Sequence, residues 1–207
     1  MLSIIQAAGW PIWPLIACSI LALALIFERF ASLKASKVAP TNLLNEAISV
    51  STKHLPSAET TQQLAQSSVL GEVLATGLRT RQAHPESSEE ELRSAMEGAG
   101  RAAAHKLEKY LSALATIASA APLLGLLGTV IGMIEIFGSQ PGASSGAGNP
   151  AQLAHGISIA LYNTAFGLLI AIPALAGWRI LRAVADQRQR ECEECTRQLF
   201  TKLYPDT

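Results

Sequence analysis

LSALATIASAAPLLGLLGTVIGMIEIF (residues 111–137) is an apolar run with a single charged residue, Glu135, near its end. Roughly 20 apolar residues are enough for a helix to cross the hydrocarbon core of a bilayer. At about 1.5 Å per residue, Glu135 would lie about 36 Å from Leu111, close to the far interface rather than the midplane. The run therefore predicts a transmembrane helix over 111–137, with Glu135 reaching headgroups or an outer loop.

Two further runs of this kind stand on either side. Residues 9–28 are apolar up to Glu28, and residues 156–178 contain no charged side chain. The chain of 207 residues is 49% hydrophobic and 15% charged, with a formal net charge of zero, as in a membrane protein with a sizeable aqueous part. We expect an all-α integral membrane protein with three transmembrane helices. A cleaved signal peptide or a lipoprotein box (LIAC, 15–18) is the weaker interpretation of the first run.

Lysine and arginine gather on one side of the predicted membrane. They follow the first run, precede the second and follow the third (Arg29, Lys34, Lys37; Arg101, Lys106, Lys109; Arg179, Arg182, Arg188, Arg190). Residues 1–8 and 138–155 contain neither. By the positive-inside rule we expect 1–8 and 138–155 to be an outer N-terminal segment and a periplasmic loop. Residues 29–110 and 179–207 are then a cytoplasmic helical domain and a cytoplasmic C-terminal helix.

The cytoplasmic part predicts helices separated by breakers, at 41–55, 57–66 and 67–82. Ser88 followed by Glu91 forms a capping box, and good helix formers run from there to the second apolar run without a proline. We therefore expect one continuous helix from Ser88 to Phe137. The tail likewise continues the third run as a charged amphipathic helix.

The sequence gives little sign of catalysis. Cys192 and Cys195 form a CxxC pair, but a structural zinc site needs four ligands and no second pair or nearby histidine accompanies them. We find no nucleophile and base pair, phosphate loop or metal cluster, and the balanced charge gives no nucleic-acid footprint. We expect no enzyme activity, no metal and no cofactor.

The second and third runs each carry a face of small residues with one threonine. Placed at 100° steps, these faces each fall within an arc of about 100° (Gly125, Gly128, Thr129 and Gly132; Gly156, Ala160, Asn163, Thr164 and Gly167). Ser158 and Tyr162 fall on the opposite side of the third run. Close helix packing explains such faces, and a lining for another helix or a thread of water explains them too.

Proton transfer through a membrane needs a titratable group or a water relay at depth. The first and third runs contain no acidic, basic or histidine residue within the span. If the chain conducts protons, a partner must supply the titrating group.

Four motifs resemble the MotA/TolQ/ExbB proton-channel family, and within it ExbB most closely. They are GWPIWPLIACSILALALIFERF (9–30), SSVLGEVLATGL (67–78), LSALATIASAAPLLGLLGTVIGMIEIF (111–137) and GISIALYNTAFGLLIAIPAL (156–175). They follow the family order and cover most of the chain. The pair APLLGLLGTVIGM and NTAFGLLIAIPA is the specific part of the signal.

The resemblance implies a subunit of a proton-driven motor in the bacterial inner membrane. It implies a pentameric helical bundle around an ExbD-like single-span partner, whose aspartate takes up and releases the proton. A TonB-like protein would then energise outer-membrane transport. Thr129 and Thr164 match the two pore threonines of the family motif, and Asn163 stands beside them. A TolQ-like stator for envelope integrity and a passive membrane scaffold are the alternatives.

One position departs from the family pattern. Many ExbB and TolQ sequences have a glutamate where this chain has Ile159. The departure implies that the partner's aspartate titrates alone, against hydroxyl and amide walls. It also raises the hypothesis that Tyr162 and Asn163 take over the polar contacts of the missing carboxylate. Ser158, Tyr162 and Glu135 are the candidates for polar support.

Overall fold

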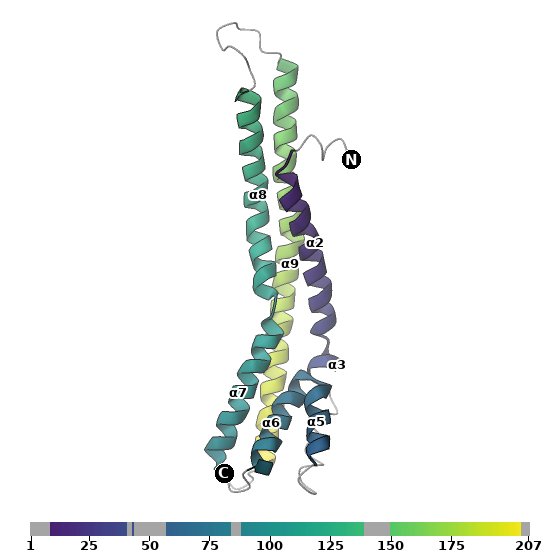
Figure 1. Ribbon diagram of the computed structural model, residues 1–207, viewed down its shortest axis with the longest axis vertical. Coiled ribbons are helices and arrows are strands. Elements are labelled where there is room, and N and C mark those ends of the chain that lie inside the picture. Colours follow the sequence, from purple (N-terminus) through teal and green to yellow (C-terminus); the bar gives the residue numbers. More distant parts are fainter. Residues whose placement is uncertain (1–8, 41–42, 44–56, 84–87, 139–149, 204–207) are drawn as a thin grey trace. The chain divides into compact units, whose positions relative to one another are not determined.

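The computed structural model describes residues 9–40, 43, 57–83, 88–138 and 150–203, and within them it contains helices and no strand (Figure 1). The expected all-α fold is thus confirmed. The chain divides into two compact units, each made of two segments. The first comprises Met1–Glu28 and Tyr110–Ile180, and the second comprises Arg29–Lys109 and Leu181–Thr207.

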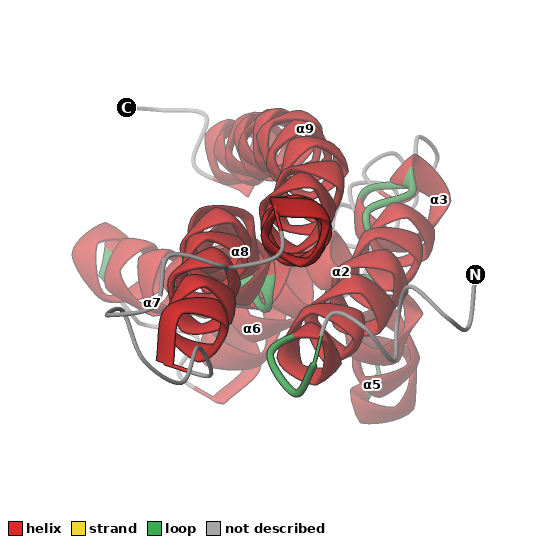
Figure 2. Ribbon diagram, turned by 90° about the horizontal axis from the view of Figure 1, so that it is seen from above, coloured by secondary structure: helices red, strands yellow, loops and turns green. Residues whose placement is uncertain are grey.

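The first unit contains most of α2 (Ile12–Ser32), α8 (Leu111–Gly138) and the first part of α9 (Pro150–Leu203). Figure 2 shows these helices end on, with α8 and α9 adjacent. They meet in a core of Leu15 from α2, Ala121 from α8, and Ile170 and Ala171 from α9. The small side chain of Ala121 lets the backbones of α8 and α9 approach closely here, as at helix contacts inside membranes.

Three helices among the described residues are long and apolar enough to cross a membrane. Pro122 and Pro173 lie inside α8 and α9, where a soluble helix would break or kink. Such prolines are tolerated in membrane spans because neighbouring groups satisfy the freed carbonyls. Large apolar side chains stay exposed over this unit, as a lipid-facing surface requires (Trp13, Ile20, Phe27, Leu123, Leu126, Ile134, Leu169, Ile172).

The expected continuous helix from Ser88 to Phe137 is wrong. The structure has two helices, α7 (Glu89–Glu108) and α8, separated by Lys109 and Tyr110. Tyr110 has φ of +66°, in the left-handed region that L-residues other than glycine rarely adopt. No glycine or proline marks the break, which coincides with the boundary between the two units.

The second unit contains the end of α2 from Arg29, α3 (Ala35–Val38), α5 (Ala58–Ser67), α6 (Val69–Ala83), α7 and the end of α9. The predicted capping box at α7 is confirmed, because Ser88 and Glu91 each accept a hydrogen bond from the other's backbone N–H. The buried face of α6 packs against α5 and α7, with Gly77 directly against Met96. The helix predicted over 41–55 lies outside the described residues except for Leu43.

The last turn of α7 is bonded to three other helices of this unit. Arg29 at the end of α2 is only 5% exposed, and its guanidinium donates to the carbonyl oxygen of Lys106 at 3.4 Å. The ammonium of Lys106 lies 2.6 Å from Glu72 on α6, and Glu108 pairs with Arg182 on α9 at 2.9 Å. A cation is favoured at a helix C-terminus, so these contacts hold α7 where it ends.

Candidate functional site

The two small-residue faces lie against each other along α8 and α9. A Cβ added at Gly125 would stand 2.7 Å from the carbonyl oxygen of Asn163 and 3.0 Å from the Cα of Thr164. At Gly167 it would stand 2.6 Å from the carbonyl oxygen of Ala121. Since real Cβ atoms do not approach backbone atoms so closely, the two helices touch backbone to backbone here.

The same contact continues toward the loop between the helices. A Cβ at Gly132 would meet the Cβ of Ala160 at 3.2 Å, and one at Gly156 would meet Ile136 at 2.5 Å. The structure therefore brings together all six small residues singled out in the sequence: Gly125, Gly128, Gly132, Gly156, Ala160 and Gly167. Within one chain, the small-residue face of α8 is therefore covered by α9, and that of α9 by α8.

Asn163 is the polar residue at the centre of the contact. Its side chain is 2% exposed and lies over Gly128, where a Cβ would stand 2.8 Å from Asn163 Cβ and 2.9 Å from Nδ2. The glycine therefore provides the space for the amide. The buried amide and the glycine beneath it therefore match in size and position.

The two threonines of the site differ in their hydrogen bonding. Thr129 donates its hydroxyl to the carbonyl oxygen of Leu126, 2.7 Å away on its own helix. The Thr164 hydroxyl is buried and has no hydrogen-bond partner among the described residues. A buried hydroxyl in that condition costs roughly 1–3 kcal/mol. Thr164 is therefore the hydroxyl of this site whose hydrogen-bonding capacity is not used within the described residues.

Thr129 also lies at the edge of a shallow hollow on α8. Val130, Met133, Ile134 and Phe137 line the hollow with it, so its walls are apolar apart from the threonine. Because the Thr129 hydroxyl donates to its own helix, it adds little polar character to the hollow. The surface suits an apolar neighbour.

The remaining polar candidates lie away from the α8–α9 contact. Ser158 is exposed and donates to the carbonyl oxygen of Ala154 at 2.9 Å. Tyr162 is 45% exposed, and Glu135 is exposed near the end of α8. The side chain of Ile159 lies outside the described part of the chain. The contact itself thus contains hydroxyl and amide groups that can bond a proton carrier but cannot take up a proton at ordinary pH.

The sequence interpretation missed two features. It treated Arg29 only as a basic residue flanking a span, whereas the guanidinium is buried against the end of α7. It also missed the break at Tyr110, for which the sequence holds no local signal. In the described residues, no group of three or more histidine, cysteine or acidic side chains could hold a metal.

Three apolar helices joined by close, small-residue contacts are the features of a multi-pass membrane protein. The chain belongs to the MotA/TolQ/ExbB proton channel family, whose model matches residues 65–194. It is 35% identical to the biopolymer transport protein exbB1 of Vibrio cholerae over 191 residues, which cover 91% of this chain and 82% of that protein.

Two further relatives show how far along the chain the likeness to ExbB and TolQ proteins extends. The putative biopolymer transport protein ExbB-like 1 of Synechocystis sp. is 33% identical, over 87% of this chain and 70% of its own length. The Tol-Pal system protein TolQ of Haemophilus influenzae is 41% identical over 75 residues, which cover 36% of this chain and 32% of that protein. The likeness to ExbB proteins thus extends over most of the chain, whereas the likeness to this TolQ covers about a third of it.

Proposed function

We propose that this chain is an ExbB-like subunit of an inner-membrane motor driven by the proton motive force. An ExbD-like single-span partner supplies the aspartate that takes up and releases the proton, and a TonB-like protein passes the movement to outer-membrane transport. The family match and the ExbB relatives support this proposal. The observation that carries it is the buried Thr164 hydroxyl without a partner among the described residues.

A buried hydroxyl is stable when it is bonded, so Thr164 fits a donor or acceptor that arrives from outside the single chain. The carboxyl group of the partner's aspartate has the required chemistry, because it accepts when ionised and also donates when protonated. Thr129 and Asn163 belong to the same proposed pathway. Since Asn163 is buried over Gly128, we assign it to positioning Thr164 in the wall.

We propose a pentamer of this chain around the partner's helices. The N-terminus is periplasmic and the C-terminus cytoplasmic, as the asymmetry of lysine and arginine indicates. Residues 9–28, 111–137 and 156–178 then span the bilayer, with 29–110 and 179–207 on the cytoplasmic side. Residues 1–8 and 138–155 lie on the periplasmic side.

The test is Thr164→Val, which keeps the shape of the side chain and removes its hydroxyl. We expect energy-dependent uptake by the motor to be abolished while the variant still copurifies with the ExbD-like partner. Ser158→Ala is the matched control, because that hydroxyl is exposed and bonded to its own helix. Full uptake by Thr164→Val would remove Thr164 from the pathway.

Ile159 gives a second test of the same proposal. Many relatives have a glutamate at position 159, so we propose that Ile159→Glu adds a second carboxyl group to the proton pathway, where two neighbouring carboxyl groups raise each other's pKa. We expect uptake to become more sensitive to external pH in this variant but not in Ile159→Gln. Identical pH profiles for the two variants would contradict a place for residue 159 on the pathway of the titrating carboxyl group.

A TolQ-like role in envelope integrity is the second candidate, favoured by the 41% identity to a TolQ protein over 75 residues. Expression of the chain in strains lacking ExbB or TolQ separates the two, and we expect rescue of the ExbB defect. A passive scaffold would instead keep its function when the proton gradient is collapsed. Measuring uptake before and after adding a protonophore distinguishes that alternative.

A further inference from the structure

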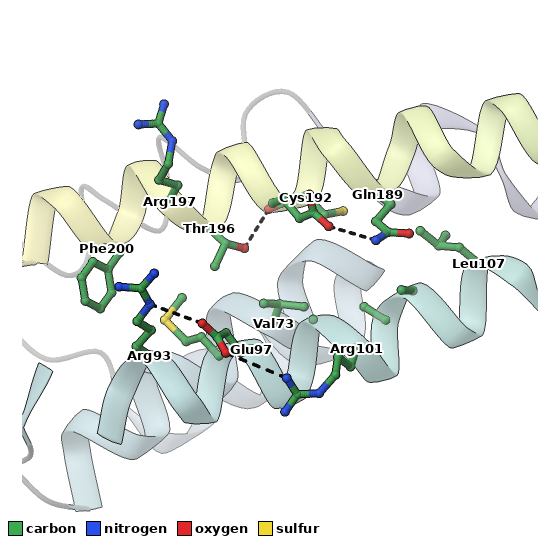
Figure 3. A pocket seen from close by; sticks show the side chains of 15 residues that line it. Val73, Arg93, Glu97, Arg101, Leu107, Gln189, Cys192, Thr196, Arg197 and Phe200 are labelled. Atoms are coloured by element: carbon green, nitrogen blue, oxygen red, sulfur yellow. Dashed lines mark hydrogen bonds and ion pairs between the residues drawn. The ribbon is translucent and has the colours of Figure 1, made fainter. Parts of the chain in front are cut away.

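The second unit contains a cavity of about 610 Å³ between α6, α7 and α9, shown from close by in Figure 3. Its floor is apolar and shielded from water, with Val73 at 2%, Met96 at 3% and Leu107 at 4% exposure. Ligand cavities usually measure about 300–1,000 Å³ and are mainly apolar, with a few polar groups placed to orient the ligand. This cavity has both properties.

The mouth of the cavity on the α7 side is cationic. Arg93 and Arg101 share one carboxylate, that of Glu97, at 3.3 and 3.9 Å (Figure 3). Two guanidinium groups against one carboxylate leave one positive charge on this edge. A guanidinium can bind a further carboxylate through two parallel N–H bonds, so the edge suits an added anion.

The wall formed by α9 is already satisfied in its hydrogen bonding. Gln189 donates to Glu193 at 2.9 Å, Thr196 donates to the carbonyl oxygen of Cys192 at 2.7 Å, and Arg197 pairs with Glu194 at 2.8 Å. Burial raises the pKa of the Cys192 thiol to about 11, so the thiol is uncharged at neutral pH, and the Glu193 carboxylate, bonded to the neutral amide of Gln189, is an acidic group on this wall. An anionic headgroup therefore fits the α7 edge and not the α9 wall, with an apolar body between them.

Gly100 keeps the cavity open on the α7 side. A Cβ added there would have no neighbouring atom within 4 Å, unlike one at Gly77, where it would stand 2.8 Å from the sulfur of Met96. Gly98 has the same open surroundings but does not line the cavity. The two glycines are thus equivalent in helix propensity and differ in their relation to the cavity.

We propose that this cavity binds a single-chain anionic amphiphile, a long-chain fatty acid, with its acyl chain over Val73, Met96 and Leu107 and its carboxylate at Arg93 and Arg101. A second protein helix fits less well, because a helix with side chains is about 10–12 Å across, whereas an acyl chain is a single file of carbon atoms that a cavity of about 610 Å³ can hold. This site goes beyond the proposed function and does not depend on it.

The test uses the full chain in lipid nanodiscs with a photoactivatable fatty acid that carries its reactive group near the methyl end. After illumination, peptide mapping locates the adducts. We expect them on the segments that contain Met96–Leu107 and Cys192–Phe200. Gly100→Leu should reduce this labelling by about tenfold by filling the cavity, whereas Gly98→Leu should leave it unchanged.

Two comparisons test the headgroup. Arg101→Gln should weaken labelling, with Arg190→Gln as the control, and a long-chain alcohol should compete less well than the acid because it lacks the charge. Equal competition by the alcohol would overturn the carboxylate assignment. Copurification of a two-chain phospholipid in the cavity, an adduct joining two copies of the chain, or undiminished labelling of a folded Gly100→Leu variant would overturn the fatty-acid site.

Discussion

Asn163 on α9 lies directly over Gly128 on α8, so that an added Cβ at Gly128 would stand 2.8 Å from the Cβ of Asn163. The amide is almost fully buried in a contact made otherwise of small side chains and backbone. The space at one residue and the size of the other are therefore complementary. The contact is specific in register, because a displacement of either helix along its axis would move the amide of Asn163 off the space that Gly128 provides.

Gly125→Ala should destabilise the α8–α9 contact by about 1–3 kcal/mol, because its methyl group would press on backbone atoms that cannot move aside. Unfolding of the purified chain in mixed micelles by increasing denaturing detergent measures the change. Gly98→Ala is the control, since its Cβ has open space, and its better helix propensity should raise stability by about 1 kcal/mol. Equal effects of the two substitutions would contradict the contact.

The two threonines should respond differently to the same substitution. Thr164→Val removes a buried hydroxyl that has no partner in the described residues, so the isolated chain should gain about 1 kcal/mol of stability. Thr129→Val removes a hydroxyl bonded within its own helix and should change stability by less than about 0.5 kcal/mol. The same micelle unfolding assay applies. A clear loss of stability in Thr164→Val would show that its hydroxyl is bonded in the isolated chain.

Tyr110→Gly should relieve the strain of a left-handed tyrosine, which costs about 1–2 kcal/mol. We expect higher thermal stability of the purified chain, reduced in part by the loss of the tyrosine ring. Lys109→Gly is the comparison, because Lys109 has an ordinary φ of −50° and gains nothing from glycine. If both substitutions destabilise equally, the left-handed conformation at Tyr110 is not a source of strain.

Cys192 should react slowly with thiol reagents and weaken the fold at high pH. Burial raises its pKa from the ordinary 9.0 to about 11, so the unfolded chain loses the thiol proton first as pH rises. The contribution of the buried, protonated Cys192 thiol to the free energy of unfolding is therefore fully present below about pH 9 and is lost as pH rises through about 11. Maleimide labelling should reach the less buried Cys195 first, and Cys192→Ala should remove part of the alkaline loss of stability. Faster labelling of Cys192 would contradict its burial.

Much of this fold could be predicted from local sequence. Apolar length identifies the three spanning helices, Ser88 and Glu91 identify the start of α7, and helical spacing places Gly128 and Asn163 on inward faces. The break at Tyr110 could not be predicted in this way, because the residues around it are ordinary helix formers. The last turn of α7 is bonded to Arg29, Glu72 and Arg182, and contacts between residues so distant in sequence override local propensity.

The different hydrogen bonding of Thr129 and Thr164 could not be predicted from the sequence either. A helical projection places Thr129 and Thr164 on small-residue faces but does not tell where each hydroxyl finds a partner. Thr129 turns to the carbonyl of Leu126, whereas Thr164 lies where its helix meets Gly125 and has no such bond. The distinction comes from side-chain conformation and packing, which a sequence pattern does not carry.

The interruption after Glu108 has a mechanical consequence when it is set beside α9. Three connections join the two units: α2 crosses between Glu28 and Arg29, and α9 crosses between Ile180 and Leu181, both as continuous helices. The third connection passes through Lys109 and Tyr110, whose backbone angles leave the helical path. The backbone hydrogen bonds of α7 therefore end before those of α8 begin, so these two helices are mechanically separate elements, whereas α2 and α9 carry their hydrogen-bond ladders across the same boundary.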